Sequence, residues 1–275
     1  CFRGRSWNRC CRCAICEGVM KPRLAVHKFS SCDGCQLSLL NLGAALPLVA
    51  ELVDIVHFAE AGPMAEDARV DIALVEGSVS TPAEAARIRD IRDNSTTLVA
   101  IGACAVSGGL QALRNLADAE DWKHAIYARA DQIDTLATAT PVAEHVRVDF
   151  EIWGCPVNSR QVVGALRDLL SGVSPKPNQE KVCSTCKQLG LPCVTVARGE
   201  PCLGPVTNDG CGALCPALGR GCYGCYGPAG TLNTEALTRQ MSSLGLDSTS
   251  IARRFAQINS HAPEFSAAAG ARKDG

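Results

Sequence analysis

The stretch that decides the fold reads Arg23-Leu24-Ala25-Val26-His27-Lys28-Phe29, followed by Ser30-Ser31-Cys32-Asp33-Gly34-Cys35-Gln36. Its first half has the apolar character of a buried strand, and its second half places a Cys-x-x-Cys pair where that strand ends. In parallel α/β sheets, ligands bind beyond the carboxyl ends of the strands. The stretch therefore predicts a site built from thiols at the end of the first strand.

Outward from this stretch, apolar strands and amphipathic helices alternate from Met20 to about Gly172. We expect strands at 23–29, 54–59, 70–76, 96–101 and 146–153. We expect helices at 36–46, 82–94, 110–116 and 159–170. This alternation is typical of an α/β fold, here a flavodoxin-like doubly wound parallel sheet, which we assign to residues 20–174.

Two further cysteines fall at predicted strand ends. Cys104 follows the fourth strand in Gly102-Ala103-Cys104, and Cys155 follows the fifth in Gly154-Cys155-Pro156. Since the carboxyl ends of parallel strands share one edge, we expect both thiols to join Cys32 and Cys35. Buried core cysteines are common, but four at strand ends are hard to explain by packing alone. We predict a metal-binding quartet, with glycines that let the backbone approach a bulky group.

The composition changes beyond Pro175. Residues 175–230 are rich in Cys, Gly and Pro and contain few apolar side chains, so metal–thiolate bonds are expected to hold this Cys-rich segment. Eight cysteines lie in it: Cys183, Cys186, Cys193, Cys202, Cys211, Cys215, Cys222 and Cys225. They could hold two zinc ions or two 4Fe–4S clusters, and their irregular spacing favours clusters over paired zinc knuckles.

Bulk composition limits the function classes. Lys and Arg number 27, Asp and Glu 28, and aromatic residues make up 4%, so we expect no nucleic-acid partner. No apolar stretch is long enough to span a bilayer, and no export signal is recognisable, so we expect a cytoplasmic protein. In a reducing cytoplasm, 17 cysteines indicate metal binding rather than disulfides.

The two ends of the sequence look different from the rest. Residues 1–19 carry Arg and Cys without periodicity, and we interpret them as a non-native or disordered extension before Met20. The alternative is an extra metal site at Cys10, Cys11, Cys13 and Cys16. After Pro228 we expect helices at 234–244 and 250–258 within a tail of residues 231–275, whose last part, 261–275, is expected to be frayed or disordered.

These motifs together resemble the small subunit of nickel–iron hydrogenases. The resemblance is carried, in order, by Ser31-Cys32-Asp33-Gly34-Cys35-Gln36, Val75-Glu76-Gly77-Ser78, Gly102-Ala103-Cys104 and Gly154-Cys155-Pro156. The later run from Pro201 to Cys225 looks like the cytoplasmic, cofactor-coupled members, including sulfhydrogenase delta subunits. Exported relatives have a His where Cys183 stands and a Pro-flanked three-iron middle cluster, whereas here Cys215 adds a thiolate.

The resemblance implies electron transfer through three 4Fe–4S clusters, with the hydrogen site in a separate large subunit and a flavin- and iron–sulfur-bearing diaphorase-type partner serving a nicotinamide-type cofactor. The cluster nearest the active site takes Cys32, Cys35, Cys104 and Cys155. The far one takes Cys183, Cys186, Cys193 and Cys202, and the middle one Cys211, Cys215, Cys222 and Cys225. A ligand exchange between the last two sets stays open.

Other residues have several interpretations. Gly34, Ala105 and Gly154 are expected to tune the nearest cluster through their backbone N–H groups. Glu76 either borders that cluster or caps a loop, and Arg220 either offsets cluster charge or is solvated. His27 is interpreted as a core histidine. Two rival functions remain: a quinone-module subunit like the 20 kDa subunit of NADH:quinone oxidoreductase, whose first motif has adjacent cysteines, and a zinc-stabilised interaction module.

Overall fold

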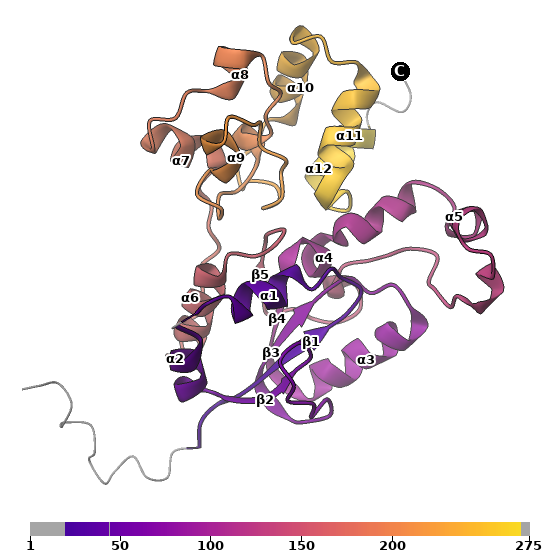
Figure 1. Ribbon diagram of the computed structural model, residues 1–275, viewed down its shortest axis with the longest axis vertical. Coiled ribbons are helices and arrows are strands. Elements are labelled where there is room, and N and C mark those ends of the chain that lie inside the picture. The colour runs from indigo at the N-terminus through magenta and orange to yellow at the C-terminus, as the bar shows by residue number, and fades with distance from the viewer. Residues whose placement is uncertain (1–19, 44, 271–275) are drawn as a thin grey trace, which may run out of the picture.

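The computed structural model describes residues 20–43 and 45–270. The predicted N-terminal extension at 1–19, and the alternative metal site within it, lie outside these residues. Figure 1 shows two lobes, an α/β lobe with the sheet and a second lobe that holds the later cysteines and the helices labelled α7 to α12. Among the described residues, no single helix is long and apolar enough to cross a membrane, although the bent pair α1 and α2 passes that test by length and composition alone.

The first lobe is a five-stranded parallel sheet with the strand order β2-β1-β3-β4-β5. This is the order of flavodoxin-like doubly wound sheets, so the predicted fold class is confirmed. The strands are β1 (Arg23–Lys28), β2 (Asp54–Phe58), β3 (Val70–Glu76), β4 (Ser95–Ile101) and β5 (Phe150–Ile152). The helices of this lobe are α1 (Gly34–Leu40), α2 (Ala45–Leu52), α3 (Pro82–Asp93), α4 (Gly102–Ser107), α5 (Ala119–Ile126) and α6 (Ser159–Leu170). Three 3₁₀ helices cover Gly109–Leu116, Ala130–Gln132 and Val142–Glu144.

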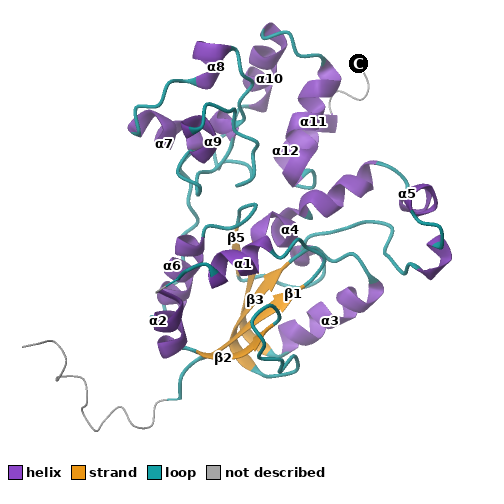
Figure 2. Cartoon of the chain, viewed as in Figure 1, coloured by secondary structure: helices purple, strands orange, loops and turns teal. Residues whose placement is uncertain are grey.

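The helices cover both faces of the sheet, as Figure 2 shows. On one face, α1 and α6 bury Leu39 and Val162 against strand residues that include Leu74. On the other face, α3 and α4 bury Ile88 and Ala105 among strand residues of the opposite parity. Because both faces are covered, the strands are apolar almost throughout, which is why the sequence reads as continuous apolar runs.

Two predicted elements of this lobe are wrong in extent. The helix expected at 36–46 is split into α1 and α2, since Gly43 takes a left-handed φ of 58° and Pro47 is tolerated only near the start of a new helix. The strand expected at 146–153 shrinks to β5, because the side chain of Asp149 accepts the Leu98 N–H at 2.9 Å in place of a strand partner. Helix α5 was not predicted, although Asp118 caps it through the amides of Glu120 and Asp121.

The second lobe contains α7 (Val182–Gln188), α8 (Val194–Arg198), α9 (Leu214–Ala217), α10 (Thr234–Ser243), α11 (Ser248–Asn259) and α12 (Pro263–Gly270), with a 3₁₀ turn at Gly204–Val206. The loops share an apolar core with the helices that follow them. Leu203 and Val206 of the loops are buried together with Met241, Phe255 and Phe265 of α10, α11 and α12. The expectation that metal–thiolate bonds hold residues 175–230 stays a prediction.

The expected frayed stretch at 261–275 is wrong for residues 263–270, which form α12. Phe265 is only 1% exposed and meets Phe255 edge-on, with ring centroids 5.8 Å apart. Such a contact stabilises the helix beyond its weak sequence pattern. Residues 271–275 lie outside the described part of the chain.

This packing predicts that α12 contributes to stability. Phe265→Ala should lower the free energy of unfolding by about 3–5 kcal/mol, since it leaves a cavity beside Phe255. Ser266→Ala, at an exposed neighbouring position, is the control and should change it by less than about 0.5 kcal/mol. Urea unfolding followed by tryptophan fluorescence measures both. Equal stabilities for the two variants would show that α12 is not part of the core.

Candidate metal centre

The structure brings the four predicted cysteines of the α/β lobe to one edge of the sheet. Cys32 and Cys35 flank the start of α1, Cys104 lies in α4, and Cys155 follows β5. Burial raises the pKa of Cys104 to about 12, and the nearby thiols of Cys155 and Cys32 contribute to the rise. Burial likewise raises the pKa of Cys35, with smaller contributions from Glu76 and then Cys104. The four thiols therefore lie close enough for their charges to interact.

Two glycines, Gly102 and Gly109, leave space for the thiols of Cys35 and Cys104. A Cβ on Gly102 would lie 2.4 Å from Cys35 Sγ, and one on Gly109 would lie 2.6 Å from Cys104 Sγ. Both glycines also adopt left-handed φ values, 87° and 58°. Any other residue would collide with a thiol and strain the backbone. The structure thus forms a cradle in which backbone and sulfur approach closely.

Glu76 caps a helix in the structure. It is 2% exposed, and its Oε1 accepts the Cys35 N–H at 2.9 Å while its Oε2 accepts the Gln36 N–H at 3.2 Å. It thus caps α1, whose own N-cap residue Asp33 makes no side-chain bond. Burial raises the pKa of Glu76, and the Cys35 N–H opposes that rise. The alternative role of Glu76, at the edge of a cluster, stays a prediction.

The predicted roles of the backbone N–H groups of Gly34, Ala105 and Gly154 stay predictions. The structure gives Gly154 a different contact, since its carbonyl oxygen accepts the Ala103 N–H at 2.7 Å. This bond joins the loop of Cys155 to the helix of Cys104. Gly154 therefore positions two of the four thiols relative to each other.

The eight later cysteines all lie in the second lobe. Cys183 and Cys186 are in α7, and Cys193 precedes α8. The others are Cys202 before the 3₁₀ turn, Cys211 and Cys215 around α9, and Cys222 and Cys225 in the following loop. All twelve cysteines among the described residues are free thiols.

The later thiols lie close enough to one another for their charges to interact. After burial, the main influence raising the pKa of Cys183 and of Cys186 is Cys202, with Cys193 also contributing. Burial, followed by Cys211 and then Cys202, raises the pKa of Cys215. Burial also raises the pKa of Cys222, and Cys202 adds more to that rise than Cys225 does. The expected division into one group of 183, 186, 193 and 202 and a second group of 211, 215, 222 and 225 therefore stays a prediction.

Two contacts link the groups to each other and to the sheet edge. The backbone N–H of Cys222 donates to Cys202 Sγ at 3.2 Å, which joins the two later groups. The Tyr226 hydroxyl donates to the Pro156 carbonyl at 3.2 Å, which joins the residue after Cys225 to the residue after Cys155. The cysteine-bearing segments thus form a continuous series through the molecule.

Other predicted residues have clear positions. Arg220 lowers the pKa of Cys215, against the larger effect of burial, so it lies close enough to offset thiolate charge. His27 is 3% exposed and stacks on His57 with ring centroids 4.6 Å apart. Burial lowers its pKa to about 3. It is a core histidine, as expected.

Sequence reasoning missed Tyr226, which lies between the sheet edge and the later thiols. Its hydroxyl donates to the Pro156 carbonyl at 3.2 Å, and its ring packs so tightly on Gly210 that a Cβ there would lie 2.1 Å away. Burial raises the pKa of this phenol, followed by the effects of Cys211 and Cys225. The adjacent Cys225 was the available signal, but nothing in the sequence marks an aromatic spacer.

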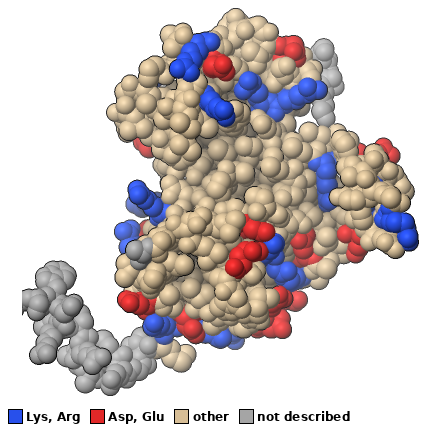
Figure 3. Space-filling view, in the orientation of Figure 1, with Lys and Arg blue, Asp and Glu red and all other residues tan. Residues whose placement is uncertain are grey.

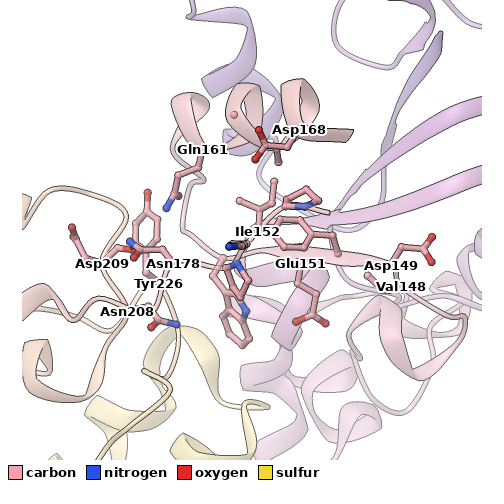
Figure 4. A pocket seen from close by; sticks show the side chains of 17 residues that line it. Val148, Asp149, Glu151, Ile152, Gln161, Asp168, Asn178, Asn208, Asp209 and Tyr226 are labelled. Carbon is pink, nitrogen blue, oxygen red and sulfur yellow. The ribbon is translucent and has the colours of Figure 1, made fainter. Parts of the chain in front are cut away.

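One cavity lies beside these thiols rather than among them. It measures about 560 Å³ and opens between β5, α6 and the segment 175–178. Figure 4 shows Gln161 and Asp168 on one side, with Asn178, Asn208 and Tyr226 on the other. Three of the carboxylates that line it bond to other groups: Asp149 to Arg92, Asp168 to Arg167, and Asp209 to the Gly212 N–H. Burial raises the pKa of the fourth, Glu151. The cavity therefore borders the metal centre without contributing a thiol to it.

The residues present fit iron–sulfur clusters. The donors are free thiols, the ligands that such clusters take, and glycines open the space beside Cys35 and Cys104. Among residues 20–43 and 45–270, no three Cys, His, Asp or Glu side chains converge on a single-ion site. The twelve thiols can hold three four-ligand groups.

Comparison with known proteins agrees with this chemistry. Residues 32–169 match the family described as NADH ubiquinone oxidoreductase, 20 Kd subunit. The sulfhydrogenase 2 subunit delta of Pyrococcus furiosus is 34% identical over 233 residues, which cover 85% of this chain and 97% of that protein.

Solved structures give the same picture. One chain of an NAD+-reducing [NiFe]-hydrogenase is 29% identical with a TM-score of 0.53, and the match covers 57% of this chain and 95% of that one. A chain of the actinobacterial-type NiFe-hydrogenase from Ralstonia eutropha H16 shares the fold over 94% of this chain and 91% of its own, with 16% identity and a TM-score of 0.54. The chain is thus an oxidoreductase subunit that belongs to the NADH:ubiquinone oxidoreductase 20 kDa subunit family, in the branch formed by the small subunits of nickel–iron and sulfhydrogenase-type hydrogenases.

Proposed function

We propose that this chain is the electron-transfer small subunit of a cytoplasmic nickel–iron hydrogenase with three 4Fe–4S clusters. Electrons pass through it between the hydrogen site of a large subunit and a flavin-bearing partner that serves a nicotinamide-type cofactor. The observation that carries the proposal is the continuous series of cysteine-bearing segments, with twelve free thiols, from the sheet edge through the second lobe. When bound, the clusters supply one-electron carriers.

The ligand sets are those that the family resemblance implies. The first set is Cys32, Cys35, Cys104 and Cys155; the second is Cys211, Cys215, Cys222 and Cys225; the third is Cys183, Cys186, Cys193 and Cys202. The hydrogen bond between Tyr226 and Pro156 supports a second set next to the first, and the bond from the Cys222 N–H to Cys202 Sγ supports a third set beside the second. Cys32 and Cys193 are both exposed, which supports contact with a partner at the first set and at the third.

Exposed apolar side chains beside the ligands support pairing with a large subunit. Leu37, two residues after Cys35, is 48% exposed, and Leu214 and Leu218 near Cys215 are 56% and 71% exposed. On the face shown in Figure 3, few charged side chains lie in the middle, between the two lobes. Apolar groups gathered near a functional site are typical of a partner interface.

Two observations bear on the second partner and on the compartment. The 29% identical structure is a chain of an NAD+-reducing enzyme, which favours a nicotinamide-linked, diaphorase-type partner here. Free thiols in such number suit a reducing compartment such as the cytoplasm.

The direct test is the metal content of the chain purified anaerobically with its partner. We expect about twelve iron and twelve acid-labile sulfide per chain, a brown colour with a broad visible band, and nickel only in the partner. A colourless preparation with stoichiometric zinc would contradict the proposal and favour a structural zinc module.

The glycine cradle gives a second prediction. Gly102→Ala places a methyl group against Cys35 Sγ and strains a left-handed φ, so iron should fall from about twelve to about eight per chain. Gly164→Ala is the matched control, since a Cβ there meets nothing within 4 Å, and it should keep full iron. Full iron in both variants would show that the first set is not packed around a bulky group.

Cys215 gives a third prediction. Cys215→Pro and Cys215→Ala both remove the additional thiolate from the second set, so one cluster should become a three-iron form with a new EPR signal after mild oxidation. The two variants separate loss of the thiol from a backbone effect of proline at the start of α9. An EPR spectrum identical to that of the unmodified protein would refute a ligand role for Cys215.

A further inference from the structure

A buried chain of hydrogen bonds joins three distant parts of the sequence. Asn259, the last residue of α11, is 1% exposed. Its Oδ1 accepts the hydroxyl of Ser107 at 2.6 Å, and its Nδ2 donates to the carbonyl of Gly224 at 2.7 Å. Ser107 itself is 1% exposed. One amide thus bridges the two lobes inside the protein.

The network fixes the orientation of the amide. If the Asn259 side chain were turned over, its oxygen would face the Gly224 carbonyl and two acceptors would meet. The Ser107 hydroxyl can donate to Asn259 or to the Ala103 carbonyl, 3.0 Å away, and the Asn259 contact is the shorter. Each end of the side chain therefore has a specific partner.

Both partners are next to proposed ligands. Ser107 lies one helical turn after Cys104 on α4, so it shares that face of the helix. Gly224 lies between Cys222 and Cys225, with a left-handed φ of 80°, and its N–H donates to Cys222 Sγ at 3.4 Å. Asn259 consequently connects the helix of a first-set ligand to the loop of two second-set ligands.

The Gly224 carbonyl belongs to the same rigid peptide group as the Cys225 N–H. Because that group is planar and trans, fixing the carbonyl toward Asn259 turns the N–H to the opposite side. Amide bonds to cluster sulfurs favour the reduced form and raise the reduction potential.

Packing alone does not explain why a polar side chain, that of Asn259, is buried at this position. Phe255 and Ile251, on the same helix, are buried among apolar residues. Burying an amide costs free energy unless its hydrogen bonds are made, and an aliphatic side chain avoids that cost. The choice of Asn is explained by the groups that it orients.

We propose that Asn259 is a positioning residue that holds the Cys222–Cys225 loop against the helix of Cys104, fixing the potential of the second cluster and its separation from the first. The inference rests on the proposed function and deepens it. Ser107 supports the amide from the side of the sheet, and Phe265 of α12 packs against Gly224 from above, where a Cβ would lie 3.3 Å from its ring.

The test uses the full chain with its partner and three variants. Asn259→Asp keeps the shape but removes the donor to Gly224, and Asn259→Ala removes both contacts. Both should shift the midpoint potential of one cluster to lower values in an EPR-monitored redox titration and weaken its magnetic coupling to a neighbouring cluster. Ser107→Ala keeps the bond to Gly224 and should give a smaller shift in the same direction.

Asn233→Ala is the matched control. Asn233 caps α10 in the same group of helices through the Ala236 N–H at 2.8 Å, and among the described residues its side chain has no hydrogen bond to a cysteine loop. Its loss should therefore lower the unfolding temperature without a shift in any potential. If Asn259→Ala fails to incorporate iron, the potentials measured in Asn259→Asp and Ser107→Ala test the inference instead. Unshifted potentials in those loaded variants, or an equal shift in Asn233→Ala, overturn the role of Asn259.

The metal content separates this inference from the function on which it rests. An unmodified chain without iron and sulfide refutes the proposed function. An unmodified chain with clusters, together with variants of unchanged potential, refutes only the positioning role.

Discussion

The structure depends on one geometric constraint: parallel strands end at the same edge of their sheet. β1, β4 and β5 are each followed within a few residues by a cysteine, and β3 ends in Glu76. The edge works as a site only because the backbone can come close to sulfur there, as Gly102 and Gly109 allow. The buried carboxylate of Glu76 then fixes the turn after Cys32. It accepts hydrogen bonds from two backbone N–H groups at the start of α1 that have no partner within the helix.

The second lobe follows a different rule. Its cysteine loops have irregular backbone and few apolar side chains, so they are held by what lies next to them. Helices α10 to α12 supply the largest side chains of the apolar core, such as Phe255 and Phe265, and the amide of Asn259 supplies a polar link to the sheet lobe. Under the proposed function, metal–thiolate bonds would add a third stabilising contribution to apolar burial and hydrogen bonding.

The sequence was sufficient for the sheet, for its parallel order and for the quartet of thiols at its edge, because strand period and cysteine position are both local signals. The sequence was less informative for residues whose conformation or role depends on tertiary contacts. The tail at 261–270 has a weak pattern of its own, and only the burial of Phe265 against Phe255 makes it a helix. Tyr226 and Asn259 were missed because their roles come from partners such as Pro156 and Ser107, which are far away in the sequence.

The dependence of the cysteine loops on later helices also sets an order of events during synthesis. The segment from Cys183 to Cys225 leaves the ribosome before α10, α11 and α12 exist to pack on it. Until then, the apolar side chains of the loops and the Gly224 carbonyl lack the partners that Phe255, Phe265 and Asn259 provide. The loops of this lobe can therefore reach their final conformation only after the C-terminal helices have been made.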